Sequence, residues 1–105
     1  MGPQLTILNV AGNPRRLAVS GDIDICTAPM LHDALCRAAD LAVSAGSGSA
    51  VTVDLSGVTF IDARGLVSLV VAEAYACVRG ASMRFSGVTP GITRLLRITD
   101  LNLRV

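Results

Sequence analysis

The chain has 105 residues, the size of one ordinary domain, and residues 1–105 are therefore treated as a single unit. Hydrophobic residues make up 51% of it and aromatic residues only 3%, which excludes a disordered chain and argues against a stacking surface for single-stranded nucleic acid. Nine Arg, no Lys and eight acidic residues leave a net charge of +1, so we expect no direct binding to nucleic acid.

Membrane and export signals are not apparent in the sequence. No apolar run approaches the roughly 18 residues of a membrane-spanning helix, and the first positive charges follow an apolar stretch, whereas a secretory signal has the reverse order. We therefore expect a cytoplasmic protein without membrane insertion. The three cysteines, Cys26, Cys36 and Cys77, match no metal-binding or redox spacing, and in a reducing compartment we expect free thiols.

A β-hairpin is predicted at the start of the chain. Residues 5–10 and 17–20 are apolar stretches on either side of the turn-forming sequence Ala-Gly-Asn-Pro at 11–14. Because aromatic residues are scarce, the core must be packed from Val, Leu, Ile and Ala, which suits a sheet covered by helices.

The first helix is predicted to begin near Thr27. This residue can accept backbone N–H bonds as an N-cap, and Pro29 is tolerated in a first helical turn. The small residues at 44–49 then predict a mobile loop. The expected inward stripe of the helix is Leu31, Leu35, Ala38 and Ala42.

The clearest strand pattern lies at residues 50–55. Val51, Val53 and Leu55 alternate there with polar side chains, as in a strand with one buried face. Ser-Gly at 56–57 allows a bend, after which the chain is expected to stay extended to Ile61.

A second helix is predicted from about 63 to 79, with Asp62 as its N-cap and Gly80 as its stop. A projection at 100° per residue divides its side chains into two faces. The expected inward face is Leu66, Val67, Val70, Ala74, Cys77 and Val78, and the expected outward face is Arg64, Ser68, Ala72, Tyr75, Ala76 and Arg79.

The remaining elements complete an α/β pattern. A strand is predicted at 82–86, a third helix from Thr89 or Pro90 to about 98, and an edge strand at 101–105. The order ββαβαβαβ predicts a single domain with a mixed, mostly parallel sheet, an N-terminal hairpin and about three helices. Functional sites in such sheets gather at the C-terminal ends of the strands, here at 21–29 and 57–66.

The second of these junctions resembles a known family. Residues 54–66 read DLSGVTFIDARGL, which is similar to the signature of STAS domains, the sulphate-transporter and anti-sigma-factor-antagonist family, approximately D-L-S-x-V-x-F-I-D-S-S-G-L. Gly-Asp-Ile-Asp at 21–24 with Thr-Ala-Pro at 27–29 resembles the family's first junction, and Gly-Val-Thr-Pro at 87–90 resembles the start of its last helix. The resemblance covers nearly the whole chain and implies a STAS domain.

The antagonist branch of this family implies a function without enzymatic activity or a cofactor. Its members dock on an anti-sigma factor with a histidine-kinase-like ATPase fold and displace the sigma factor, until phosphorylation of a Ser after the capping Asp ends the interaction. That position holds Ala63 here, and Arg64 follows it. The resemblance therefore implies an antagonist that is not phosphorylated at the usual position. The partner-binding residues that it implies are Asp24, Thr27, Asp62, Ala63, Arg64, Gly65, Ser68, Leu69, Ala72, Thr89 and Pro90.

Several alternatives stay open at this point. Thr59 and Ser68 are the nearest hydroxyls and are weak candidates for a substitute acceptor, and Cys26, beside the first junction, is a candidate for redox control. Arg64 either preserves docking or blocks it, and in the second case the chain is a STAS scaffold or accessory subunit of another assembly, such as a lipid-transport ABC complex or a stress-sensing complex.

Metal binding and catalysis are not expected. Asp22, Asp24 and Asp62 could meet at one sheet edge, but an N-cap is the favoured role of Asp62. His32 and Cys36 offer only two ligands. No nucleophile elbow, phosphate loop or dinucleotide fingerprint occurs in the sequence.

Overall fold

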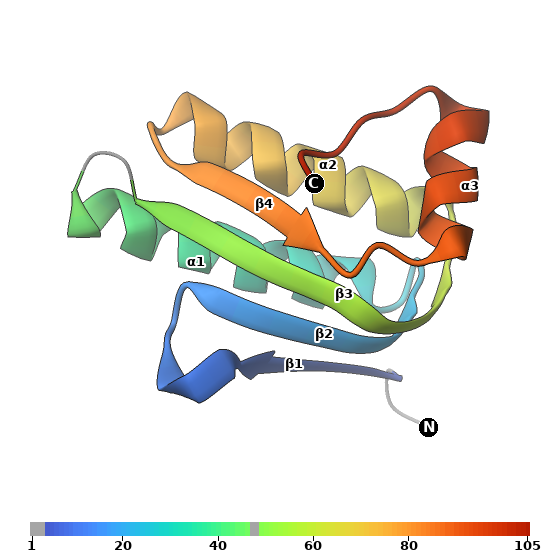
Figure 1. Ribbon diagram of the computed structural model, residues 1–105, viewed down its shortest axis with the longest axis horizontal. Helices are drawn as coiled ribbons and strands as arrows, with labels where there is room; N and C mark the ends of the chain where they lie inside the picture. The colour runs from blue at the N-terminus through green and yellow to red at the C-terminus, as the bar shows by residue number, and fades with distance from the viewer. Residues whose placement is uncertain (1–3, 47–48) are drawn as a thin grey trace.

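Four strands form one sheet in the order β1-β2-β3-β4, and two helices cover one of its faces (Figure 1). The computed structural model describes residues 4–46 and 49–105, so residues 47 and 48 of the expected loop lie outside it. β1 is antiparallel to β2, whereas β2, β3 and β4 are parallel. The elements are β1 (Leu5–Asn9), the 3₁₀ turn η1 (Val10–Gly12), β2 (Arg16–Ile23), α1 (Ala28–Ala45), β3 (Ala50–Ile61), α2 (Ala63–Val78), β4 (Ser82–Ser86) and α3 (Pro90–Thr99).

The alternation along β3 separates the inside of the sheet from the outside. Val51, Val53 and Leu55 are fully buried beneath the helices, and Thr52 between them is exposed on the open face. The predicted α/β domain, its N-terminal hairpin and its three helices are confirmed.

The helix α1 has the predicted buried stripe. Leu31, Leu35, Ala38 and Ala42 all lie in the core, together with Ala39. None of the described helices combines the length and apolar character needed to span a membrane.

The buried face of α2 differs from the predicted one. Val67, Ala74, Cys77 and Val78 were expected to face inward but are exposed, whereas Ala72 and Ala76 were expected to face outward but are buried. Apolar residues surround most of this helix, so their spacing did not define a face, and contacts with both α1 and the sheet decide it. The residues of α2 that are buried are Gly65, Leu66, Leu69, Ala72 and Ala76.

The predicted final strand at 101–105 is wrong. The Phe85 N–H donates to the Arg104 carbonyl at 2.8 Å, so the segment runs along the outer edge of β4. The Arg104 N–H, however, donates to the Glu73 carboxylate of α2 at 2.7 Å and not to a strand. A side chain thus takes the donor that a ladder would need, and the described residues form a sheet of only four strands.

Candidate docking site at two strand-to-helix junctions

The junction between β3 and α2 is shaped by the predicted N-cap. The Asp62 carboxylate accepts the Gly65 N–H at 2.8 Å, and the Asp62 carbonyl accepts the Leu66 N–H at 3.0 Å. The first bond satisfies a donor that a helix start otherwise leaves without a partner, and the second is the first regular bond of the helix. The role of Asp62 as a cap is confirmed, and its carboxylate is committed to the backbone.

The junction between β2 and α1 lacks the side-chain cap that the sequence predicts at Thr27. The Thr27 side chain makes no capping bond to α1. The Asp24 carboxylate accepts the N–H groups of Cys26 at 2.8 Å and Thr27 at 3.1 Å. Thr27, only 1% exposed, accepts the Asp24 N–H at 2.9 Å and donates to the Asp22 carbonyl at 2.8 Å. Thr27 therefore fixes the turn from inside, and its side chain does not form part of the surface.

Close packing joins the two junctions. The Asp62 N–H donates to the Ile23 carbonyl at 3.2 Å, which links the end of β3 to the end of β2. Gly65 is buried against the same carbonyl, and a β-carbon at this position would overlap it. The Thr59 hydroxyl also donates to the Asp22 carboxylate at 2.9 Å. As the sequence predicted, the two junctions meet at the C-terminal edge of the parallel strands.

The outer surface at this edge is an apolar groove between α1 and α2. Ile25 is 58% exposed, Val67 46% and Val71 47%. Such exposed aliphatic side chains in one place are typical of a surface that another protein covers. The groove has a volume of about 380 Å³, and its walls are Ile25, Ala28, Pro29, His32, Asp33, Arg64, Val67, Ser68 and Val71.

Arg64 lines this groove, which we call the docking groove, and Ala63 lies next to it. Both residues are exposed in the first turn of α2, and together with Val67 they line a smaller adjoining hollow. Within the described part of the chain, the only salt bridge joins Arg79 to Asp40, so the Arg64 guanidinium has no intramolecular ion pair there.

Two of the expected partner-binding residues of α2, Leu69 and Ala72, have side chains in the core and not on the surface. Both are 0% exposed. Sequence reasoning missed Ile25 and Val71, and it placed Val67 inside. The spacing of Val67 and Val71, one turn apart beside the exposed Arg64, was the signal that could have found this face.

Thr89 and Pro90 flank the site on another side. The Thr89 hydroxyl accepts the Ile92 N–H at 3.4 Å, so Thr89 is the N-cap of α3, and the helix begins at Pro90, one of its two predicted starts. Thr89 borders a hollow of about 280 Å³ with the last residues of β3. This hollow lies against Val58, Thr59, Phe60, Ile61, Thr89 and Gly91.

The hydroxyl and thiol groups near the site differ in their exposure to solvent and in their hydrogen bonds. The Ser68 hydroxyl donates to the Gly65 carbonyl at 2.6 Å and is half-buried. Cys26 is exposed beside the groove. Cys36 contacts His32 at 3.5 Å between Sγ and Nε2, and burial, with the negative charges of Asp40 and Asp33, raises the pKa of its thiol.

Metal ligands do not assemble in the described ranges, where no three His, Cys, Asp or Glu side chains lie close enough to hold one ion. Asp22, Asp24 and Asp62 instead accept the local hydrogen bonds given above. These three carboxylates therefore hold the junctions in shape.

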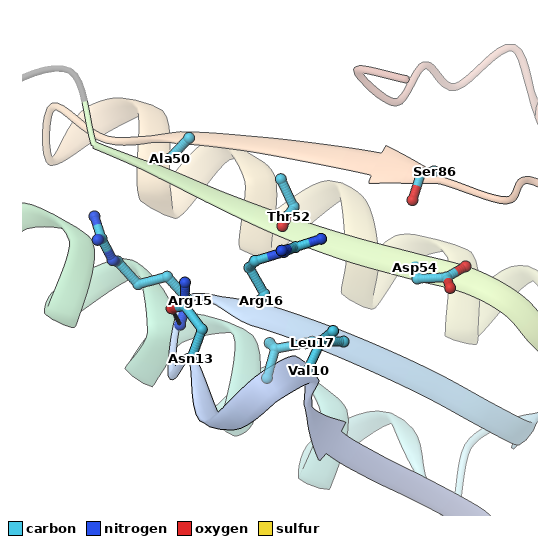
Figure 2. Close-up of a pocket in the computed structure, with 9 residues that line it drawn as sticks. All are labelled: Val10, Asn13, Arg15, Arg16, Leu17, Ala50, Thr52, Asp54 and Ser86. Atoms are coloured by element: carbon cyan, nitrogen blue, oxygen red, sulfur yellow. Dashed lines mark hydrogen bonds between the residues drawn. The ribbon is translucent and has the colours of Figure 1, made fainter.

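A separate hollow of about 520 Å³ lies on the open face of the sheet (Figure 2). Figure 2 shows Arg15 and Arg16 pointing in different directions from the start of β2, with Thr52 and Asp54 on β3. Hydrogen bonds from Ser56 lower the pKa of Asp54. This hollow shares no residue with the docking groove.

A two-layer α/β domain with an apolar groove and a tightly capped helix start is a module suited to protein docking. Residues 8–103 match the family model described as "Mlab, STAS domain", and the chain belongs to the STAS domain family. Among solved structures, the crystal structure of an anti-sigma factor antagonist from Mycobacterium paratuberculosis superposes with a TM-score of 0.64. The two sequences are 24% identical over 95% of this chain and 83% of that chain, which establishes the shared fold.

Proposed function

We propose that this protein is an anti-sigma factor antagonist that docks on a kinase-type anti-sigma factor through the start of α2 and thereby frees a sigma factor. The contact surface consists of the exposed Ala63 and Arg64 with the aliphatic side chains of Ile25, Val67 and Val71. The adjoining residues Asp24, Asp62, Gly65, Ser68, Thr89 and Pro90 hold this surface in shape or border it.

The exposed methyl group of Ala63 carries this proposal. It occupies the position after the capping Asp62, where the donors and the positive dipole end of a helix would favour a phosphate. Alanine has no oxygen to accept a phosphoryl group, so no charge of about −2 can enter the interface at this position. We propose that docking is therefore not ended by phosphorylation there.

The neighbouring hydroxyls are poor substitutes. Ser68 is half-buried and donates to its own helix, and Thr59 donates to the Asp22 carboxylate, which would repel a phosphate. Both groups are already engaged in the fold, and modification would disturb the junctions themselves.

Arg64 favours a second candidate function. Its unpaired guanidinium stands at the end of the groove, and the matched family model is described by the name Mlab and not as an antagonist. A partner with an acidic patch would suit this cation. In this second candidate, the domain is a STAS scaffold or accessory subunit of another assembly, such as a lipid-transport ABC complex or a stress-sensing complex.

Binding to purified kinase-type anti-sigma factors from the source genome tests the proposal. We expect the protein to bind one of them, to take up no label from radiolabelled ATP, and to keep its affinity when ATP is present. Ala63→Ser is expected to acquire label and to dissociate in an ATP-dependent manner. Failure to bind any such factor would overturn the proposal. Uptake of label by the protein with its natural sequence would overturn the inference that phosphorylation does not end docking.

Matched charge insertions locate the contact. Ala63→Glu is expected to weaken binding by about tenfold or more, because it places a negative charge in the interface. Ala74→Glu is the control, since Ala74 is also exposed on α2 but lies about three turns away. Equal effects of the two substitutions would contradict docking at the helix start.

A further inference from the structure

Among the described residues, no strand pairs with the outer edge of β1. The Asp22 N–H donates to the Gln4 carbonyl at 2.8 Å, and the register continues with Thr6 opposite Ser20. In an antiparallel pair, alternate residues point their backbone groups to the same side. The even positions of β1 therefore bond to β2. The outward N–H and C=O groups belong to Leu5, Ile7 and Asn9.

This edge lacks the usual protection against pairing with another chain. The sequence of β1, Leu-Thr-Ile-Leu-Asn, contains no charge and no proline, and Leu8 is 61% exposed. The opposite edge of the sheet differs, because the Phe85 N–H of β4 is satisfied by the Arg104 carbonyl. Of the two edges, the one at β1 is open and apolar.

An apolar groove lies between this edge and α1. Its volume of about 590 Å³ is larger than that of each hollow described in the preceding subsections. Leu5, Ile7 and Leu17 are among the residues that line it. Met30, 41% exposed, and Leu41, 45% exposed, line it from α1. Apolar surface of this extent beside an open strand edge favours a partner that pairs with the strand and covers the groove.

The α1 side of this edge groove is self-complementary. Along the helix it presents Met30, then Asp33, then Arg37, then Leu41. Two copies placed antiparallel would bring Met30 opposite Leu41 and Asp33 opposite Arg37, because each pair is centred near residue 35. Neither Asp33 nor Arg37 has an ion pair within the described part of the chain. Such a pattern fits a twofold interface, in which the same patch serves both subunits.

The edge strand β1 can share the twofold axis that the side chains of α1 suggest. An antiparallel pairing of two β1 strands about Ile7 places Leu5 opposite Asn9, so all the outward backbone groups find partners. Ile7 lines the edge groove together with Ala34 and Ala38, the residues on either side of the helix centre. One twofold axis therefore satisfies both the strand edge and the helix.

We propose that the occupant of this edge is a second copy of the chain, paired through β1 to form a continuous eight-stranded sheet. In this dimer the N–H of Ile7 donates to the carbonyl of the partner's Ile7, and the reverse bond completes the pair. The side chains along α1 close the apolar groove, with Asp33 of each copy facing the guanidinium on the other. The docking groove shares only Asp33 with this edge groove, so each copy keeps most of its docking groove in the dimer. The existence of the dimer does not depend on the proposed function.

Sedimentation equilibrium over a range of concentrations tests the dimer. We expect a mass of twice 10.8 kDa at high micromolar concentration. Ile7→Pro removes an outward N–H and none that bonds to β2, and proline is tolerated on an edge strand. This variant is expected to be monomeric with an unchanged circular dichroism spectrum. Ile7→Lys, which places a charge on the edge, is the second variant in case the proline disturbs folding.

A charge exchange tests the register. Arg37→Asp is expected to weaken dimerisation by about tenfold, since it turns two attractive rim pairs into repulsive ones. The double variant Asp33→Arg with Arg37→Asp restores the pairing and is expected to recover most of the affinity. Arg94→Asp, on the exposed side of α3, is the control and should leave dimerisation unchanged.

Amide hydrogen exchange supplies a readout at single residues. The amides of Leu5, Ile7 and Asn9 are expected to exchange slowly in concentrated protein and rapidly in dilute protein, while those of Thr6 and Leu8 stay protected in both. A chain that is monomeric at millimolar concentration would overturn the proposal. So would a dimer that neither Ile7 variant weakens, because such a dimer must form through another surface.

Discussion

Gly65 in the first turn of α2 lies against the carbonyl oxygen of Ile23 at the end of β2. The same carbonyl accepts the Asp62 N–H at 3.2 Å, so one backbone oxygen receives both a hydrogen bond and a close packing contact from the second junction. This contact brings the start of α2 next to the turn that precedes α1. The shape of the proposed docking surface depends on it.

Gly65→Ala is expected to destabilise the protein. Glycine inside a helix normally costs about 0.5–1 kcal/mol relative to alanine, but here the added methyl would overlap the Ile23 carbonyl and force the backbone apart, at a cost of about 1–3 kcal/mol. Urea denaturation measures the change. Gly91→Ala in α3 is the control, because a β-carbon there would meet only the Thr89 hydroxyl, at 3.9 Å, and its stability should stay equal or rise.

Leu69 and Val67 should separate stability from binding. Leu69→Ala removes a fully buried side chain and is expected to lower the free energy of unfolding by about 2–5 kcal/mol. Val67→Ala removes a side chain that is 46% exposed, and its cost in stability should stay below about 1 kcal/mol. The same Val67 variant should weaken partner binding. The opposite ranking in denaturation would mean that α2 is rotated about its axis.

The cap at Asp62 is expected to affect both order and docking. Asp62→Ala loses the bond to the Gly65 N–H and should cost about 1 kcal/mol, with faster amide exchange confined to the first turn of α2. Asp62→Asn keeps an oxygen acceptor and should retain most of the stability. If the asparagine variant is as unstable as the alanine variant, the carboxylate acts through its charge and not as a cap.

The Asp54 carboxyl is expected to make the stability of the protein depend on pH in acidic solution. Hydrogen bonds from the backbone and the side chain of Ser56 lower its pKa in the folded protein. A lowered folded pKa contributes stability that is present above the ordinary value, about 3.9, and is lost as the pH falls through the lowered value. Asp54→Asn should therefore flatten the loss of stability below about pH 4, measured by denaturation at several pH values. An equal flattening in Asp100→Asn, at the end of α3, would contradict a specific role for Asp54.

Local sequence patterns predicted the helices and strands and the junction between β3 and α2. The alternation in β3, the stripe on α1, the cap at Asp62 and the start of α3 at Pro90 depend on residues within a few positions of one another, and the structure confirms each of them. The STAS signature around Ala63 is local as well. These features were predictable because neighbouring residues decide them.

Contacts between distant segments decided the rest. Thr27 looks like a side-chain cap in the sequence, but it is buried, and its hydroxyl bonds to Asp22 and Asp24 within the turn and not to the helix. The final segment resembles a strand, yet Glu73, thirty-one positions away, accepts the Arg104 N–H that a ladder would use. No local pattern contains Glu73 as a partner of the final segment.

The amino-acid pattern was enough to predict the order of the four strands and three helices, the α/β class of the domain and the missing hydroxyl at Ala63. Tertiary structure alone decided which side of α2 is buried, and therefore that Val67 borders a groove while Leu69 fills the core. The physical reason is that α2 is apolar on most sides, so the free energy gained by burying one face of the isolated helix is nearly the same as for another. Only the positions of α1 and the sheet make one of these faces the inside.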